Sequence, residues 1–191
     1  MQIKQLYEKY QIMPQLAQHQ LRVGGIVSLI TKDKAAILTA LVHDMGNIVK
    51  FSNLDLGWTS VQEIFQKKYG RDANLATLKI LDDAGLTKLR DLVEQEAEFY
   101  QNVINIEDFS KVSLPATLTL YADSRVAIDG VVSLEERIVD LETRYKQHRS
   151  DREWAYKLED YVQSLSRCDV KSITEEMVTP LFDELLTYRV E

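Results

Sequence analysis

The chain contains few residues that break helices or cross-link a fold, and this scarcity narrows the choice of architecture. Its 191 residues include one cysteine, three prolines and seven glycines. The single Cys168 excludes a disulfide bond within the chain and is typical of proteins from a reducing compartment. No useful length of sequence alternates apolar and polar residues, as a strand with one buried face does. We therefore expect an all-α protein.

Long apolar runs and excess positive charge are also missing. Apolar runs such as residues 35–38 fall far short of the roughly 20 residues needed to cross a bilayer, and the first residues lack the apolar centre of a signal peptide. The net charge of −7 disfavours sequence-independent binding to DNA or RNA, because that binding depends on neutralising phosphates. We expect a cytoplasmic protein that binds neither duplex nucleic acid nor membranes. A small anionic ligand in a locally basic pocket stays compatible with this charge.

Apolar residues recur at helical spacing along most of the chain. Pro14 suits the first turn of one helix, and Asp33 is placed to cap the next, which we expect to reach about Phe51. A further apolar helix is expected over residues 114–126. These helices would supply most of the core.

The C-terminal part of the chain shows the same helical pattern. A serine and a glutamate with the spacing of a capping box open a predicted helix over residues 133–148. Pro180 falls inside the last apolar stretch and predicts a bend there. No internal repeat, low-complexity segment or clear linker divides the chain, so we expect a single domain over residues 1–191.

Two of the three histidines stand in apolar surroundings, where an unpaired polar group is costly. His19 lies on the helix that begins at Pro14, His43 is followed directly by Asp44, and Asp123 follows an apolar run. Imidazole and carboxylate groups together suit Mn, Fe, Co, Ni or Zn, whereas Mg prefers oxygen ligands. Taken singly, each residue is more often a hydrogen-bonded core or surface group than a ligand. Spacing alone leaves their convergence open.

The order of these residues resembles the HD-domain superfamily of metal-dependent phosphohydrolases. The resemblance is carried by His19, by the run Ala40-Leu41-Val42-His43-Asp44-Met45-Gly46-Asn47, and by Tyr121-Ala122-Asp123-Ser124-Arg125-Val126. It covers about residues 14–127, and the helices of about 131–191 would form a C-terminal extension. The implied fold is an HD-domain-like helical bundle.

The resemblance implies roles for four residues. His19, His43, Asp44 and Asp123 look like the protein ligands of one divalent metal ion, with water in the open positions. Asp44 would also orient the attacking water. Relatives with two or three metals use further histidines, and none occurs between residues 45 and 122, so a single metal is implied.

Two cations are candidates for holding a phosphate beside that metal. Arg22 lies three residues after His19 on the same helical face, as an arginine does in several relatives, although a structural salt bridge would explain it equally well. Asn47 stands where many relatives have a lysine. Lys50, seven residues after His43 on the expected helix, could replace that lysine or simply be solvated. The catalytic candidates are therefore Asp44, Arg22 and Lys50.

Other residues carry weaker expectations. One of Glu94, Glu96 and Glu98 could donate a proton to a leaving group, although a solvated helix face is the commoner arrangement. Trp58 could stack on a base or anchor a loop. Arg125 lies two residues after Asp123, which turns it away from the metal ligands and favours a structural role.

Three functions remain open from the sequence. The first is a phosphohydrolase that acts on a small phosphate monoester or a nucleotide, with a single divalent metal activating water. The alternative is a non-catalytic metal- or nucleotide-binding helical module, which the missing lysine favours. The third is a helical interaction protein whose C-terminal apolar side chains form a homodimer rather than packing on the core. No residue pattern identifies a base or a sugar.

Overall fold

The computed structural model describes residues 1–50, 60–106, 108–146 and 152–190, and its architecture confirms the all-α prediction. The α-helices of these residues are α1 (Ile3–Lys9), α2 (Pro14–Ile30), α3 (Lys34–Val42), α4 (Ser60–Tyr69), α5 (Ala73–Asp83), α6 (Thr87–Asn102), α7 (Leu114–Asp123), α8 (Leu134–Tyr145), α9 (Glu153–Leu165), α10 (Glu175–Val178) and α11 (Phe182–Thr187). The shorter 3-10 turns are η1 (Met45–Lys50), η2 (Val103–Asn105), η3 (Phe109–Lys111), η5 (Val170–Ser172) and η6 (Thr179–Leu181). The strands β1 (Val126–Ala127) and β2 (Gly130–Val131) pair antiparallel.

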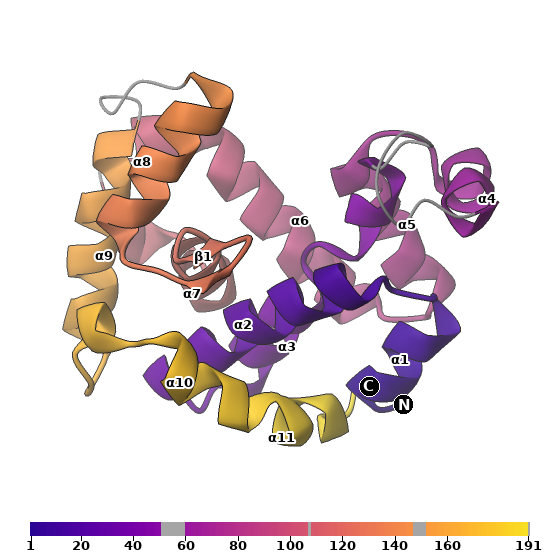
Figure 1. Cartoon of the computed structure of the whole chain (residues 1–191), viewed down its shortest axis with the longest axis horizontal. Coiled ribbons are helices and arrows are strands. Elements are labelled where there is room, and N and C mark those ends of the chain that lie inside the picture. The colour runs from indigo at the N-terminus through magenta and orange to yellow at the C-terminus, as the bar shows by residue number, and fades with distance from the viewer. Residues whose placement is uncertain (51–59, 107, 147–151, 191) are drawn as a thin grey trace.

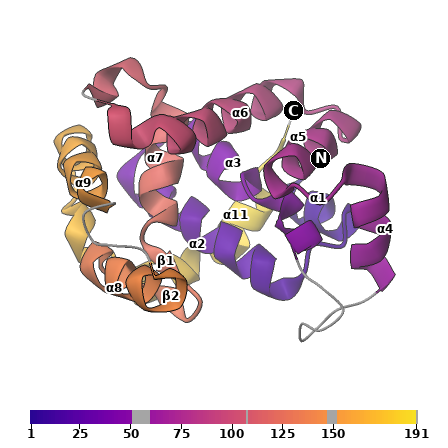
Figure 2. The ribbon, with the colours of Figure 1, turned by 90° about the horizontal axis from the view of Figure 1, so that it is seen from above.

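The centre of the molecule is formed by α2, α3 and α7, which pack against one another, while α6 covers α7 and α3 (Figures 1 and 2). Helices α8 and α9 lie together at one side, and α10 and α11 run along α2. One cluster of buried apolar side chains extends from Ile3 to Val190. The two ends of the chain lie side by side, because the backbone of Met1 and Val190 forms hydrogen bonds in both directions. Among the described residues, no helix combines the length and apolar character that crossing a bilayer requires.

The C-terminal apolar residues pack on the core, as expected by default. Trp154 and Leu185 are buried. Side chains that are partly buried against the same cluster are Tyr156, Tyr161, Leu181 and Leu186. Self-association through these helices stays a prediction.

The predicted helix from Asp33 to Phe51 is wrong in its second half, since α3 ends at Val42. The cap is confirmed, because the Asp33 carboxylate accepts a hydrogen bond from the backbone of the helix. The helix ends because the N–H of Gly46 donates to the hydroxyl of Thr77 on α5, at 2.8 Å, instead of to a carbonyl one turn back. The chain then continues as the 3-10 turn η1. His43 and Asp44 therefore lie at a helix end and not within a helix.

The helix expected over residues 114–126 also ends early, at Asp123. The next residues form the β1–β2 hairpin, whose second strand begins at Gly130 with a φ of +145°. The side chain of Arg125 turns inward and donates to the carbonyls of Val132, Val170 and Ile173. These tertiary bonds draw the backbone out of the helix and place Asp123 at its last turn.

The remaining expectations concern the C-terminal helices. The capping box at Ser133 is confirmed, and the helix it opens is α8, which ends at Tyr145. The bend at Pro180 is confirmed, because η6 separates α10 from α11 there. Trp58 and His148 lie outside the described residues.

Candidate metal centre

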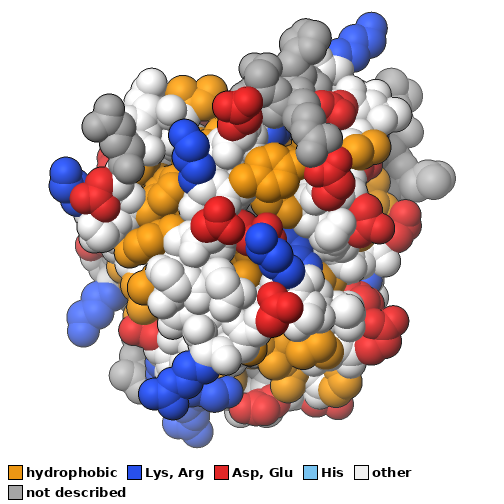
Figure 3. Space-filling model, turned by 90° about the vertical axis from the view of Figure 1, so that its left-hand side faces the viewer, with side chains coloured by type: hydrophobic (Ala, Val, Ile, Leu, Met, Phe, Trp, Pro, Cys, Tyr) orange, Lys and Arg blue, Asp and Glu red, His pale blue; other side chains and the backbone are white. Residues whose placement is uncertain are grey.

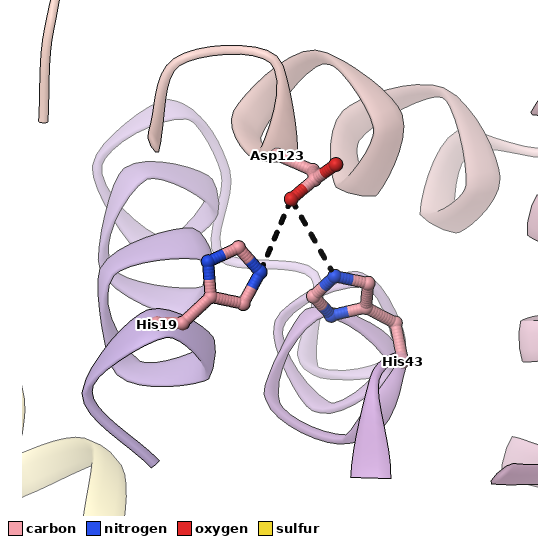
Figure 4. Close-up of side chains that lie close together, drawn as sticks. All are labelled: His19, His43 and Asp123. Atoms are coloured by element: carbon pink, nitrogen blue, oxygen red, sulfur yellow. Dashed lines mark ion pairs between the residues drawn. The ribbon is translucent and has the colours of Figure 1, made fainter. Parts of the chain in front are cut away.

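Three central helices bring the predicted ligands together. His19 lies in the second turn of α2, His43 is the residue that ends α3, and Asp123 is the last residue of α7. In Figure 4 the two imidazoles lie side by side with Asp123 between and above them. The Oδ1 atom of Asp123 is 3.1 Å from Nε2 of His19 and 3.9 Å from Nε2 of His43. Packing of α2, α3 and α7 therefore produces the convergence that spacing left open.

Asp44 approaches the same point from the other side. Its Oδ2 atom lies 3.5 Å from Nε2 of His19 and 3.8 Å from Nε2 of His43. The amide of Asn47 donates a hydrogen bond to this oxygen. Asn47 thus fixes the orientation of Asp44.

The imidazole of His43 is held in one orientation by the backbone. Its Nδ1 atom lies 2.9 Å from the carbonyl of Ala40. A carbonyl only accepts, so Nδ1 carries a proton and donates. Nε2 is then the nitrogen that faces the cluster, and a bond of this kind is what usually fixes the tautomer of a metal-binding histidine.

The geometry of the cluster fits a divalent metal ion. The Nε2 atoms of His19 and His43 are shielded from solvent and form no well-directed hydrogen bond with any described residue. One ligand atom from each of His19, His43 and Asp123 lies within 4.8 Å of the others. Ligands at about 2.1 Å from a tetrahedral metal lie about 3.4 Å apart, close to the separations seen here. His19, His43 and Asp123 could therefore hold a metal ion. Asp44, the fourth predicted ligand, lies near both imidazoles but is not part of this three-residue group.

The cluster stabilises charge on its members even without a metal. Burial alone would lower the pKa of His43, but the carboxylates of Asp44 and Asp123 raise it to about 10. Burial alone would raise the pKa of Asp123, but hydrogen bonding and charge from His19 and His43 hold it well below its usual range. A divalent cation would take over the role of the protonated imidazole, because coordination requires the neutral ring.

Glu96 on α6 is the member of the three candidate glutamates that faces the cluster. Burial raises the pKa of Glu96 to about 7, and the charges of Asp123 and Asp44 act in the same direction while His43 opposes them. Glu94 instead pairs with Arg90, and Glu98 is exposed. The sequence offered three glutamates spaced two residues apart, and only the packing of α6 selects among them.

The two predicted phosphate-binding cations occupy different surroundings. Nε of Arg22 donates to both carboxylate oxygens of Glu175 on α10, at 2.9 and 3.1 Å. Glu175 also accepts from the backbone N–H of Val131, so it ties α2 to the hairpin. Lys50 is exposed at the end of η1. The same-face argument for Lys50 fails, because the α-helix it assumed ends eight residues earlier at Val42.

Arg125 has the structural role that its position favoured. It is 1% exposed, and besides its three carbonyl partners it donates to the hydroxyl of Tyr121 and lies 3.8 Å from the carboxylate of Glu159. These contacts join α7 to α9 and to the segment before α10. Arg125 therefore holds the C-terminal helices against the helix that carries Asp123.

A comparison of the chain with family models, with curated proteins and with solved structures finds no match in any of the three.

Proposed function

We propose that the protein is an HD-domain-type, metal-dependent phosphohydrolase that acts on a small phosphate monoester or a nucleotide. The observation that carries the proposal is the convergence of two Nε2 atoms, from His19 and His43, on the carboxylates of Asp44 and Asp123, without a well-directed hydrogen bond to either. The order of these four residues supports the family assignment. Their donor atoms favour Mn, Fe, Co, Ni or Zn over Mg.

The chemistry follows from what each residue can do. A divalent ion bound here would polarise a phosphoryl oxygen and lower the pKa of a water. Asp44, oriented by Asn47, is placed to align the attacking water and accept its proton. Glu96, whose pKa is raised to about 7, carries its proton at neutral pH often enough to donate it to the leaving oxygen.

The test is release of phosphate from a panel of monoesters and nucleotides, with each candidate metal supplied in turn. Asp44→Asn keeps the size of the side chain and removes its charge, and we expect it to lower the rate about 100-fold or more. Asp82→Asn, a change at an exposed aspartate of α5, is the matched control and should leave the rate unchanged. Wild-type activity in Asp44→Asn would rule out this mechanism.

A second function is favoured by two specific observations. Asn47 replaces the lysine of many relatives, and Nε of Arg22 is already engaged by Glu175. Both features reduce the positive charge offered to a phosphate, which suits a non-catalytic module that binds a metal or a nucleotide. Saturable nucleotide binding without turnover under any of the five metals would favour that module.

A further inference from the structure

A small cavity adjoins the candidate metal centre on the side of the C-terminal extension. It has a volume of about 100 Å³ and lies between α6, α7, α8 and α9. Asp123 is part of its wall, together with Arg137 from α8 and with Trp154 and Ala155 from α9. Asp123 belongs to both the cluster and the cavity wall, so the two sites adjoin at this residue.

Arg137 brings an unused hydrogen-bond donor to the cavity. Its side chain is 17% exposed, and Nη1 donates to Asp140 one turn along α8, at 2.7 Å. Its Nε atom is shielded from solvent and has no hydrogen-bond partner among the residues that the structure describes. A buried guanidinium N–H without an acceptor is costly, so the arrangement favours a ligand that supplies one.

Arg137 shares its acidic partner with a second guanidinium group. Asp140 accepts hydrogen bonds from Arg144 as well as from Arg137, so one carboxylate serves two guanidinium groups. The cavity wall further includes Arg152, which lies 5.9 Å from the ring centre of Trp154. Most other side chains of the wall are apolar, and a surrounding of low polarity strengthens the attraction between a guanidinium and an anion.

The positive charge is local to the cavity and not part of a broad basic surface. Figure 3 shows the side of the molecule on which α8 and α9 lie. Among the side chains coloured by type there, acidic, basic and hydrophobic ones are interspersed. This favours a small anion in a pocket over the backbone of a nucleic acid.

We propose that this cavity binds one oxyanion of the size of a phosphate group, with Nε of Arg137 as a donor. The proposal rests on the proposed function, because it takes the oxyanion to be part of the phosphorylated substrate. An apolar cavity of about 150 Å³ is known to bind benzene, and drug-sized ligands fill about 300–1,000 Å³. A cavity of about 100 Å³ thus excludes a nucleobase. The oxyanion is either the phosphoryl group that meets the metal or a second phosphate of the same substrate.

The test is calorimetric titration of the full chain with inorganic phosphate, with and without Mn²⁺. Arg137→Gln removes the charge and the Nε donor, and phosphate binding should weaken about 10- to 100-fold. Arg144→Gln is the matched control, since Arg144 lies on the same helix, pairs with the same Asp140 and is not part of the cavity wall. It should bind phosphate as the wild type does. Stronger binding with Mn²⁺ would assign the oxyanion to the transferred phosphoryl group, and equal binding would assign it to a second phosphate.

A second variant keeps the test decisive if Arg137→Gln does not fold. Ala155→Leu fills the cavity from α9 and leaves Arg137 in place, and it should also abolish phosphate binding. Wild-type affinity in the folded variants, or no phosphate binding by the wild type, would overturn the proposal. Metal content and metal-dependent phosphate release are measured on the same proteins. Their absence from the wild type would reject the proposed function, whereas their presence in the wild type alongside unchanged phosphate affinity in the variants would reject the oxyanion site alone.

Discussion

The charge of His43 is set by the carboxylates around it, and this makes stability depend on pH. In the metal-free protein the pKa of His43 is raised from 6.5 to about 10, chiefly by Asp44 and Asp123 acting against burial. A group whose pKa is raised in the folded state contributes its full stabilisation of the fold at pH values below its pKa in the unfolded chain. That contribution is lost as the pH rises through its pKa in the folded protein. The window is therefore from about pH 6.5 to about pH 10.

We expect the free energy of unfolding of the metal-free protein to fall between pH 7 and pH 9, by up to about 1 kcal/mol per pH unit. Bound Ni²⁺ should suppress this fall, because the coordinated imidazole is neutral throughout the window. Urea denaturation at pH 7, 8 and 9 in EDTA measures the fall in the free energy of unfolding. The same series in Ni²⁺ measures how far the metal suppresses it. His43→Gln should flatten the profile in EDTA. Identical slopes with and without metal would show that His43 is not a ligand.

Arg125 makes a second prediction at the scale of one residue. Replacing it with methionine keeps much of the volume but leaves Glu159 without its buried partner and three carbonyls without their donor. Breaking a buried charge pair in this way costs about 3–5 kcal/mol. Chemical denaturation should show this loss, while the more exposed Arg144→Gln should cost about 1 kcal/mol or less. Equal stability of the two variants would contradict the structural role of Arg125.

The position of each element depends on close backbone contacts as well as on side chains. Gly46 allows η1 to lie directly on α5, since a Cβ atom there would be 2.2 Å from the carbonyl oxygen of Ala73 and 2.3 Å from the backbone nitrogen of Thr77. Backbone atoms of a helix cannot move aside as a flexible side chain can. The contact fixes the turn that carries His43 and Asp44.

Gly46→Ala should therefore destabilise the fold by about 1–3 kcal/mol, through overpacking against α5. The substitution should also weaken metal binding, because η1 must shift and Asp44 directly precedes η1. Thermal denaturation and metal titration measure the two effects. The control is Gly85→Ala, where the Cβ meets no atom within 4 Å and only the positive φ of +73° is strained. Metal affinity should fall in the first variant alone, and an equal fall in both would contradict this account.

Helix starts with a local cap were predictable from the sequence, whereas the ends of α3 and α7 were not. Asp33, Asp72 and Ser133 cap helices through bonds to residues three positions away, so a short window of sequence contains the whole interaction. The ends of α3 and α7 depend instead on Thr77 and on the distant carbonyls that bind Arg125. No local pattern contains those partners.

At the scale of the whole molecule, the candidate site is a product of how three central helices pack. The apolar faces of α2, α3 and α7 were readable from the sequence, and the motif order named His19, His43, Asp44 and Asp123. Where these side chains meet depends on how the three helices pack, and the sequence alone does not show that. For the same reason the sequence did not separate Glu96 from Glu94 and Glu98 and did not point to Arg137, because the packing decides which face of each helix meets the centre.

The central claim is that these residues hold a metal ion, and metal content tests it most directly. Protein purified without chelators, or dialysed against Mn²⁺, Co²⁺, Ni²⁺ or Zn²⁺, is analysed by elemental mass spectrometry beside Asp123→Ala and Asp44→Ala. Circular dichroism checks that each variant stays helical. We predict about one metal ion per chain in the wild type, as expected for one four-ligand site, and its loss in Asp123→Ala. No metal in the wild type after dialysis, or equal content in Asp123→Ala, would contradict the account.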